Sequence, residues 1–169
     1  MVQSAIEFLR QYVSPQVVVF IVSMLPVAEL RGGLIAASIL GIPWINAAVI
    51  SIIGNVLPIP VILLFVRKVL DRLKNTKAFH KLAQKYETKA LTKGAEMVEK
   101  YPGKVMFALY IFVAIPLPMT GAWTGSLIAA FLDLPIKRSF PAIVAGVATA
   151  AVIMLVLTYL APALLWVKG

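Results

Sequence analysis

The chain has 169 residues, of which 61% are hydrophobic and 14% charged, with a mean hydropathy of +0.94. Soluble domains carry about 25% charged residues, so this composition excludes an ordinary soluble domain and predicts one all-α integral membrane domain over residues 1–169. The net charge of +9 could suit nucleic acid, but 11 of the 16 Lys and Arg residues lie between Arg67 and Lys104. That clustering is typical of a cytoplasmic topology signal, so no nucleic-acid partner is predicted.

Residues 1–66 are predicted to form a first repeat with an amphipathic start, a re-entrant helical hairpin at 15–41 and a span at 44–66. Ser14 and Pro15 suit the N-cap and first position of a helix. Two apolar runs of roughly ten residues flank a break at Pro26, and each would give about 15 Å of helix, half the thickness of a bilayer core. The chain is therefore expected to enter and leave by the same face. Trp44 is typical of an interface anchor.

The break after Pro26 contains Glu29 and Arg31, the only charges in residues 11–66, followed by the glycines Gly32 and Gly33. A charge at the centre of a bilayer costs roughly 2.5–3.5 kcal/mol, so an intramembrane pair predicts a functional site. A purely structural ion pair between helices is the alternative. Two polar residues spaced four apart on one face of the span are expected to complete the site: Ser51 and Asn55.

Residues 67–104 are predicted to form a basic cytoplasmic connector. Five lysines recur at every fourth position, which predicts an amphipathic helix that is solvated or lies on the anionic inner leaflet; they are Lys77, Lys81, Lys85, Lys89 and Lys93. His80 within this segment is expected to be an ordinary surface residue.

Residues 105–169 repeat the pattern, with a second hairpin at 105–133 and a span at 139–163. Pro26, Pro43 and Gly54 recur 92 positions later as Pro118, Pro135 and Gly146, and the motif Leu-Ile-Ala-Ala at residues 34–37 recurs at residues 127–130. A hairpin plus one span per half would insert the halves in opposite orientations, which is the inverted repeat of many transporters. Lys137 and Arg138 would then share the cytoplasmic face with the connector. Asp133 is expected to cap a helix or contact a lipid head group.

The predicted site is a midplane region where the two hairpin tips meet. Glu29 could carry a proton and Arg31 could hold an anionic group through its planar guanidinium. The second tip follows Pro116 and Pro118 and would add hydrogen-bond donors, close backbone approach and a gating or packing tryptophan; its residues are Thr120, Gly121, Trp123, Thr124 and Gly125. A single His and dispersed acids predict no metal site, and the chain shows no enzyme signature and no cofactor motif.

The two tip motifs, Pro-Val-Ala-Glu-Leu-Arg-Gly-Gly from Pro26 and Pro-Leu-Pro-Met-Thr-Gly-Ala-Trp-Thr-Gly from Pro116, resemble those of the small multidrug export protein family, which is similar to the DedA superfamily. The resemblance covers nearly the whole chain. It implies paired re-entrant hairpins, inverted repeats and lipid translocation with suggested proton coupling. The acid here follows Pro26, whereas the usual DedA pattern has an acid before Pro-x-Pro.

Three functions stay open on these grounds. They are a transporter or flippase for an anionic lipid or small anion, a proton-coupled small multidrug exporter, and a non-transporting structural membrane protein. Anionic membrane lipids and further copies of the chain are the expected partners, and a prokaryotic cell membrane is the expected location.

Overall fold

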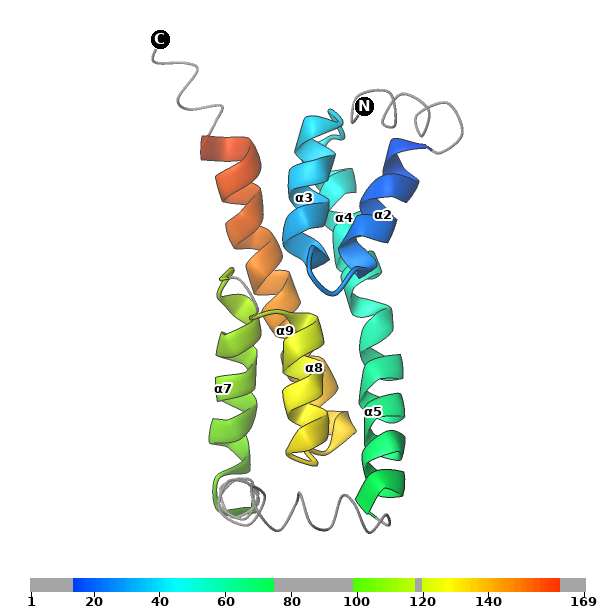
Figure 1. Ribbon diagram of the computed structural model, residues 1–169. Helices are drawn as coiled ribbons and strands as arrows, with labels where there is room; N and C mark the ends of the chain where they lie inside the picture. Colours follow the sequence, from blue (N-terminus) through cyan, green and yellow to red (C-terminus); the bar gives the residue numbers. More distant parts are fainter. Residues whose placement is uncertain (1–13, 75–98, 118–119, 162–169) are drawn as a thin grey trace. The chain divides into compact units, whose positions relative to one another are not determined.

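The computed structural model describes residues 14–74, 99–117 and 120–161, and within them every regular element is a helix (Figure 1). The chain divides into two compact units. The first comprises residues 1–57 and 147–169, and the second comprises residues 58–146. The connector helix predicted around Lys77 to Lys93 lies outside the described residues.

The first unit contains a hairpin of two short helices, α2 (Pro15–Met24) and α3 (Glu29–Ile39), followed by α4 (Trp44–Val56). Ser14 precedes α2 as its N-cap and Pro15 begins the helix, as predicted, although the Ser14 side chain makes no capping hydrogen bond. Pro26 ends α2 because a residue before proline avoids helical angles, and Leu25 is extended with ψ 138°. The three helices pack against one another.

The second unit contains α5 (Pro58–Lys74), α7 (Pro102–Ala114), α8 (Ala122–Phe131) and the start of α9 (Ile136–Leu155). Helix α7 begins three residues before the predicted hairpin boundary, and α9 begins at Ile136 where the predicted span begins at residue 139. The end of α9 continues in the first unit as a π-helix, η1 (Val156–Leu160). Both predicted hairpins are therefore pairs of helices of 10 to 13 residues.

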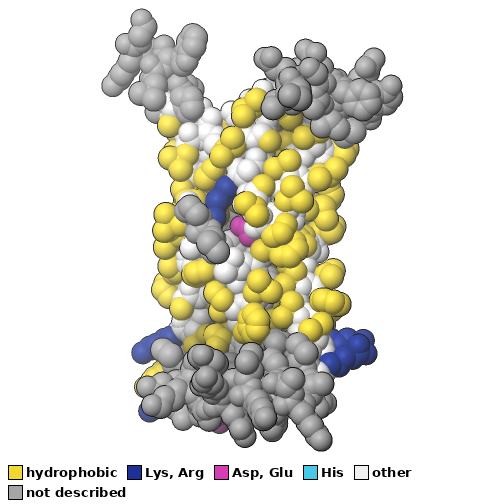
Figure 2. Space-filling model, in the orientation of Figure 1, with side chains coloured by type: hydrophobic (Ala, Val, Ile, Leu, Met, Phe, Trp, Pro, Cys, Tyr) yellow, Lys and Arg dark blue, Asp and Glu magenta, His cyan; other side chains and the backbone are white. Residues whose placement is uncertain are grey.

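Two helical stretches are long and apolar enough to cross a membrane, Trp44–Val69 and Ile136–Leu160. Only 33% of the most apolar window in each is buried, whereas a core helix of a soluble protein would be mostly buried. Hydrophobic side chains dominate the face drawn in Figure 2. Length, composition and exposed apolar surface together define a helical membrane protein.

The recurrence at an interval of 92 residues extends to backbone contacts within each unit. A Cβ atom added to Gly54 would lie 2.7 Å from the Phe20 carbonyl oxygen, and one added to Gly146 would lie 2.9 Å from that of Tyr110. Each of these glycines therefore lets its helix approach the first helix of the neighbouring hairpin closely.

The turns that follow α3 and α8 also match. The Ile42 amide donates to the Ala37 carbonyl at 2.9 Å, and the Leu134 amide donates to the Ala129 carbonyl at 2.9 Å. Such bonds close the ends of helices, and the residue in the left-handed region is Gly41 in one turn (φ 69°) and Asp133 in the other (φ 52°). The two hairpins thus end by the same local geometry.

Each of these turns is held by one long side chain. The Nη2 group of Arg67 donates to the Leu134 carbonyl oxygen at 2.6 Å, and the Tyr159 hydroxyl donates to the Ile42 carbonyl oxygen at 3.0 Å. Arg67 and Tyr159 are themselves 92 positions apart. Arg67 also forms an ion pair with Asp133 at 2.9 Å. The Asp133 side chain, expected to cap a helix or meet a head group, has this protein partner and is 74% exposed.

Candidate functional site

Glu29 is the first residue of α3 and occupies an unusual backbone conformation. Its φ of +50° lies in the left-handed region, which a side chain other than glycine rarely adopts. Its side chain is only 5% exposed, and its amide donates to the Leu25 carbonyl at 2.9 Å. Strained residues of this kind concentrate at functional sites, and the N-terminus of a helix favours a carboxylate. Glu29, which the sequence predicted as a site residue, is therefore buried at the hairpin tip in a strained backbone conformation.

Arg31 lies two residues further along α3 and is partly buried. The Glu29 carboxylate interacts electrostatically with its guanidinium, and both side chains have interaction partners in the structure. The two charges of the predicted pair therefore lie close enough to interact electrostatically. Val27, between Pro26 and this pair, is 98% exposed, so the hairpin tip carries a fully exposed apolar side chain.

Ser51 and Asn55 lie on the buried face of α4, with exposures of 0% and 2%. A Cβ atom added to Gly33 would lie 2.9 Å from the Ser51 Oγ and would collide with the Ser23 Oγ. The two hydroxyl oxygens therefore gather around the backbone of α3 at Gly33. Ser23, which is fully buried, was not predicted as a site residue; its only signal is a hydroxyl near the end of an otherwise apolar run.

The register of α3 and α4 extends this cluster toward the tip. The two helices contact each other and are joined by a short reversal at residues 40–43, so they run antiparallel. Gly33 faces Ser51, and four residues along each helix, about 6 Å, lead to Glu29 on α3 and Asn55 on α4. This register places Glu29 and Asn55 one helical turn nearer the tip than Gly33 and Ser51.

The second tip is closed by its own hydrogen bonds. The Thr120 hydroxyl lies 2.7 Å from the Ile115 carbonyl oxygen and 2.8 Å from that of Leu117, so its hydrogen is directed into the loop. Gly121 is the N-cap of α8 and is buried, whereas Trp123 and Thr124 are partly exposed.

The remaining predicted glycines and prolines have mainly packing surroundings. A Cβ atom added to Gly125 would lie 2.6 Å from Val113, and one added to Gly32 would lie 2.6 Å from the Ala28 Cβ. Pro116 lies just beyond α7, and Pro118 lies outside the described residues. That the second-tip residues join Glu29 and Arg31 in one site stays a prediction.

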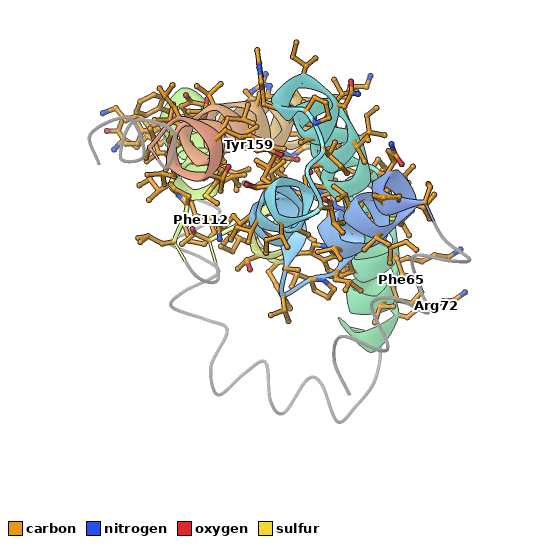
Figure 3. The ribbon with its side chains drawn as sticks, turned by 90° about the horizontal axis from the view of Figure 1, so that it is seen from above. Phe65, Arg72, Phe112 and Tyr159 are labelled. Atoms are coloured by element: carbon orange, nitrogen blue, oxygen red, sulfur yellow. The ribbon has the colours of Figure 1, made fainter. Side chains whose placement is uncertain are left out.

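An apolar hollow of about 500 Å³ lies in the first unit, at the end of α4 remote from the hairpin tip. It is lined by Trp44, Val152, Leu155, Val156, Tyr159 and Leu160. Tyr159, labelled in Figure 3, extends from η1. Trp44 is 56% exposed beside it, as suits the interface anchor predicted from the sequence.

The pairs of short helices and the two long apolar helices define a helical membrane protein, with Glu29 and Arg31 as its candidate site. The profile of the family described as "Putative small multi-drug export protein" matches residues 29–153, and the chain belongs to this family. No curated protein and no solved structure matches the chain. The family places the chain among membrane export proteins, and the predicted relation to the DedA superfamily stays a prediction.

Proposed function

We propose that the protein is a secondary transporter or flippase that moves an anionic lipid head group or small anion together with a proton on Glu29. The observation that carries this proposal is the buried, strained Glu29 beside Arg31 at a hairpin tip. Ionisable residues inside membranes are costly and mark substrate or proton pathways.

The coupling follows from competition for one guanidinium. When Glu29 is ionised, its carboxylate neutralises Arg31 electrostatically. When Glu29 takes up a proton, Arg31 is left to pair with an anion from outside the protein, and guanidinium binds phosphate and carboxylate through two parallel hydrogen bonds. The N-terminus of α3 adds a further site of positive potential. Proton and anion would therefore bind together and leave together.

Alternating exposure of this site would use two inverted repeats with re-entrant hairpins. The recurrence of Gly54 as Gly146, and of the tyrosine and arginine bonds to equivalent turns, supports a duplicated architecture. Arg67 contacts the turn that precedes Lys137 and Arg138, so basic residues gather at one end of the second unit. This supports a re-entrant second hairpin with that end in the cytoplasm of a prokaryotic cell, by the positive-inside rule.

A second candidate is export of small cationic drugs, which the family description favours. Glu29 would then bind the cation in exchange for a proton, and Arg31 would keep the carboxylate ionised. The two candidates predict opposite roles for Arg31, because an anionic substrate needs the guanidinium and a cationic one is repelled by it.

Reconstituted vesicles distinguish the two candidates. Purified protein would be reconstituted with a fluorescent anionic phospholipid or, separately, with a cationic dye under an imposed pH gradient. We expect proton-dependent movement of the anionic lipid, loss of it in Arg31→Lys, and loss of its pH dependence in Glu29→Gln. Arg67→Lys, the same exchange at an arginine outside the proposed site, should keep full activity. Dye movement that increases in Arg31→Ala, which removes the positive charge, would establish the drug-export candidate in its place.

A further inference from the structure

Ser51 and Asn55 carry buried oxygen atoms that have no hydrogen-bond partner among the described residues. Four other hydroxyls in the described helices donate to the carbonyl four residues earlier, at 2.6 to 3.2 Å; they belong to Ser23, Ser126, Ser139 and Thr158. Within the described part of the chain, neither the Ser51 Oγ nor the Asn55 Oδ1 has a protein hydrogen-bond partner. Native proteins leave few buried polar atoms unsatisfied, so each one requires an explanation.

The second unit shows that packing does not require these oxygens. The contacts of Gly33 with Ser23 and Ser51 are repeated by Gly125 with Val113, at 2.6 Å, and with Ile143, at 4.0 Å. The same close helix approach is therefore built in the second unit with apolar side chains alone. The oxygens of the first unit must have another use.

The chemistry of the cluster selects a cation. The Ser23 hydrogen is directed to the Val19 carbonyl, so its oxygen lone pairs face Gly33 and Ser51. The Asn55 Oδ1 is an acceptor only, and the Ser51 Oγ carries lone pairs that can also accept. Ser23 also lies in the last turn of α2, where the helix dipole is negative. A hard cation takes oxygen ligands of this kind, so the set favours a cation.

We propose that Ser23, Ser51 and Asn55 form a binding site for a small monovalent cation, with Na⁺ as the fitting ion. Glu29 lies one helical turn from Gly33 on the same helix, so its carboxylate, when ionised, would add negative potential near the site. In membrane transporters with broken helices, the C-terminal ends of half-helices help to coordinate coupling ions, and Ser23 lies at such an end. The site goes beyond the proposed proton and anion, and its occupancy is measurable without any transport, so the two proposals can fail separately.

Ion binding to the purified full-length protein tests the proposal directly. The melting temperature would be followed by tryptophan fluorescence in NaCl, KCl and choline chloride at constant ionic strength, and ²²Na⁺ binding would be measured by equilibrium dialysis. We expect the melting temperature to rise with NaCl concentration only, because a ligand that binds the folded state stabilises it. One saturable ²²Na⁺ site per chain should accompany the rise.

Variants assign the site to its residues. Ser51→Ala and Asn55→Leu should each raise the Kd for ²²Na⁺ at least about tenfold, and Asn55→Asp should keep binding. Ser126→Ala, which removes a buried hydroxyl already bonded within its own helix, is the matched control and should bind as the wild type does. Equal melting temperatures in NaCl and choline chloride, without saturable ²²Na⁺ binding by the wild type, would show that the oxygens hold water only and overturn the proposal. Unchanged ²²Na⁺ affinity in the Ser51 and Asn55 variants would overturn it equally.

Discussion

Gly33→Ala tests how closely α3 approaches the hydroxyls of α2 and α4. The added methyl group would collide with the Ser23 Oγ and lie 2.9 Å from the Ser51 Oγ. The Ser23 hydroxyl cannot turn away freely, because it donates to the Val19 carbonyl at 2.7 Å. Overpacking of a close-packed core costs about 1–3 kcal/mol, and losing the hydrogen bond costs about 1 kcal/mol more.

The substitution also brings a gain, since alanine favours a helix over glycine by about 1 kcal/mol. The net free energy of unfolding should therefore fall by roughly 1–3 kcal/mol, the overpacking range that remains once the gain offsets the lost bond. For a chain of this length that corresponds to a melting temperature lower by roughly 2–12 °C. Thermal unfolding of the purified protein, followed by tryptophan fluorescence, measures the change.

Two further variants identify the cause. In Gly103→Ala the new methyl group meets no atom within 4 Å, so stability should be unchanged or slightly raised. The double variant Ser23→Ala with Gly33→Ala should recover part of the loss, because the colliding oxygen is gone; the coupling between the two changes is the direct measure of their contact. If Gly33→Ala and Gly103→Ala have the same melting temperature, α3 does not approach the Ser23 and Ser51 hydroxyls as closely as the structure shows.

Substitutions at other contacts should lower the stability by smaller amounts, and a labelling experiment tests the topology. Tyr159→Phe should lower stability by about 1 kcal/mol through the lost hydrogen bond to the α3–α4 turn, and an unchanged melting temperature would contradict that bond. Asp133→Asn should cost less than about 1 kcal/mol, since the ion pair is exposed, whereas Arg67→Met should cost more because the Leu134 carbonyl also loses its donor. Single cysteines at Arg72 and Lys137 should react with an impermeant maleimide from the same side of the membrane; labelling from opposite sides would reject the re-entrant second hairpin.

Much of the fold could be predicted because its signals are local. The breaks at Pro26 and Pro116 and the half-length apolar runs beside them predicted two pairs of short helices, which the structure contains. Proline acts on its own and the preceding residue, and apolar run length is read directly from the sequence. The interval of 92 residues likewise predicted matched glycines, and Gly54 and Gly146 do have matched contacts.

The parts of the site that could not be predicted depend on tertiary contacts. Ser23 lies in an apolar run where a hydroxyl usually bonds to its own helix, and only the approach of Gly33 and Ser51 gives it a further role. The left-handed conformation of Glu29 is fixed by the turn around it, since no glycine or asparagine marks the position. In the sequence, Arg67 is one of many basic residues that indicate the cytoplasmic side, and only the structure shows that it also donates to the Leu134 carbonyl.

The central claim is that Glu29 and Arg31 work in transport and are more than a structural pair, and one double variant tests it most directly. Glu29→Gln with Arg31→Gln removes both charges together, so neither is left buried without its partner, and the variant should melt close to the wild type. Its movement of fluorescent anionic phospholipid across reconstituted vesicles is then compared with that of the wild type under the same pH gradient. The account predicts a folded protein with transport at the level of empty vesicles. Transport at the wild-type rate, with the wild-type response to pH, would contradict it and leave the charged tip with a structural role.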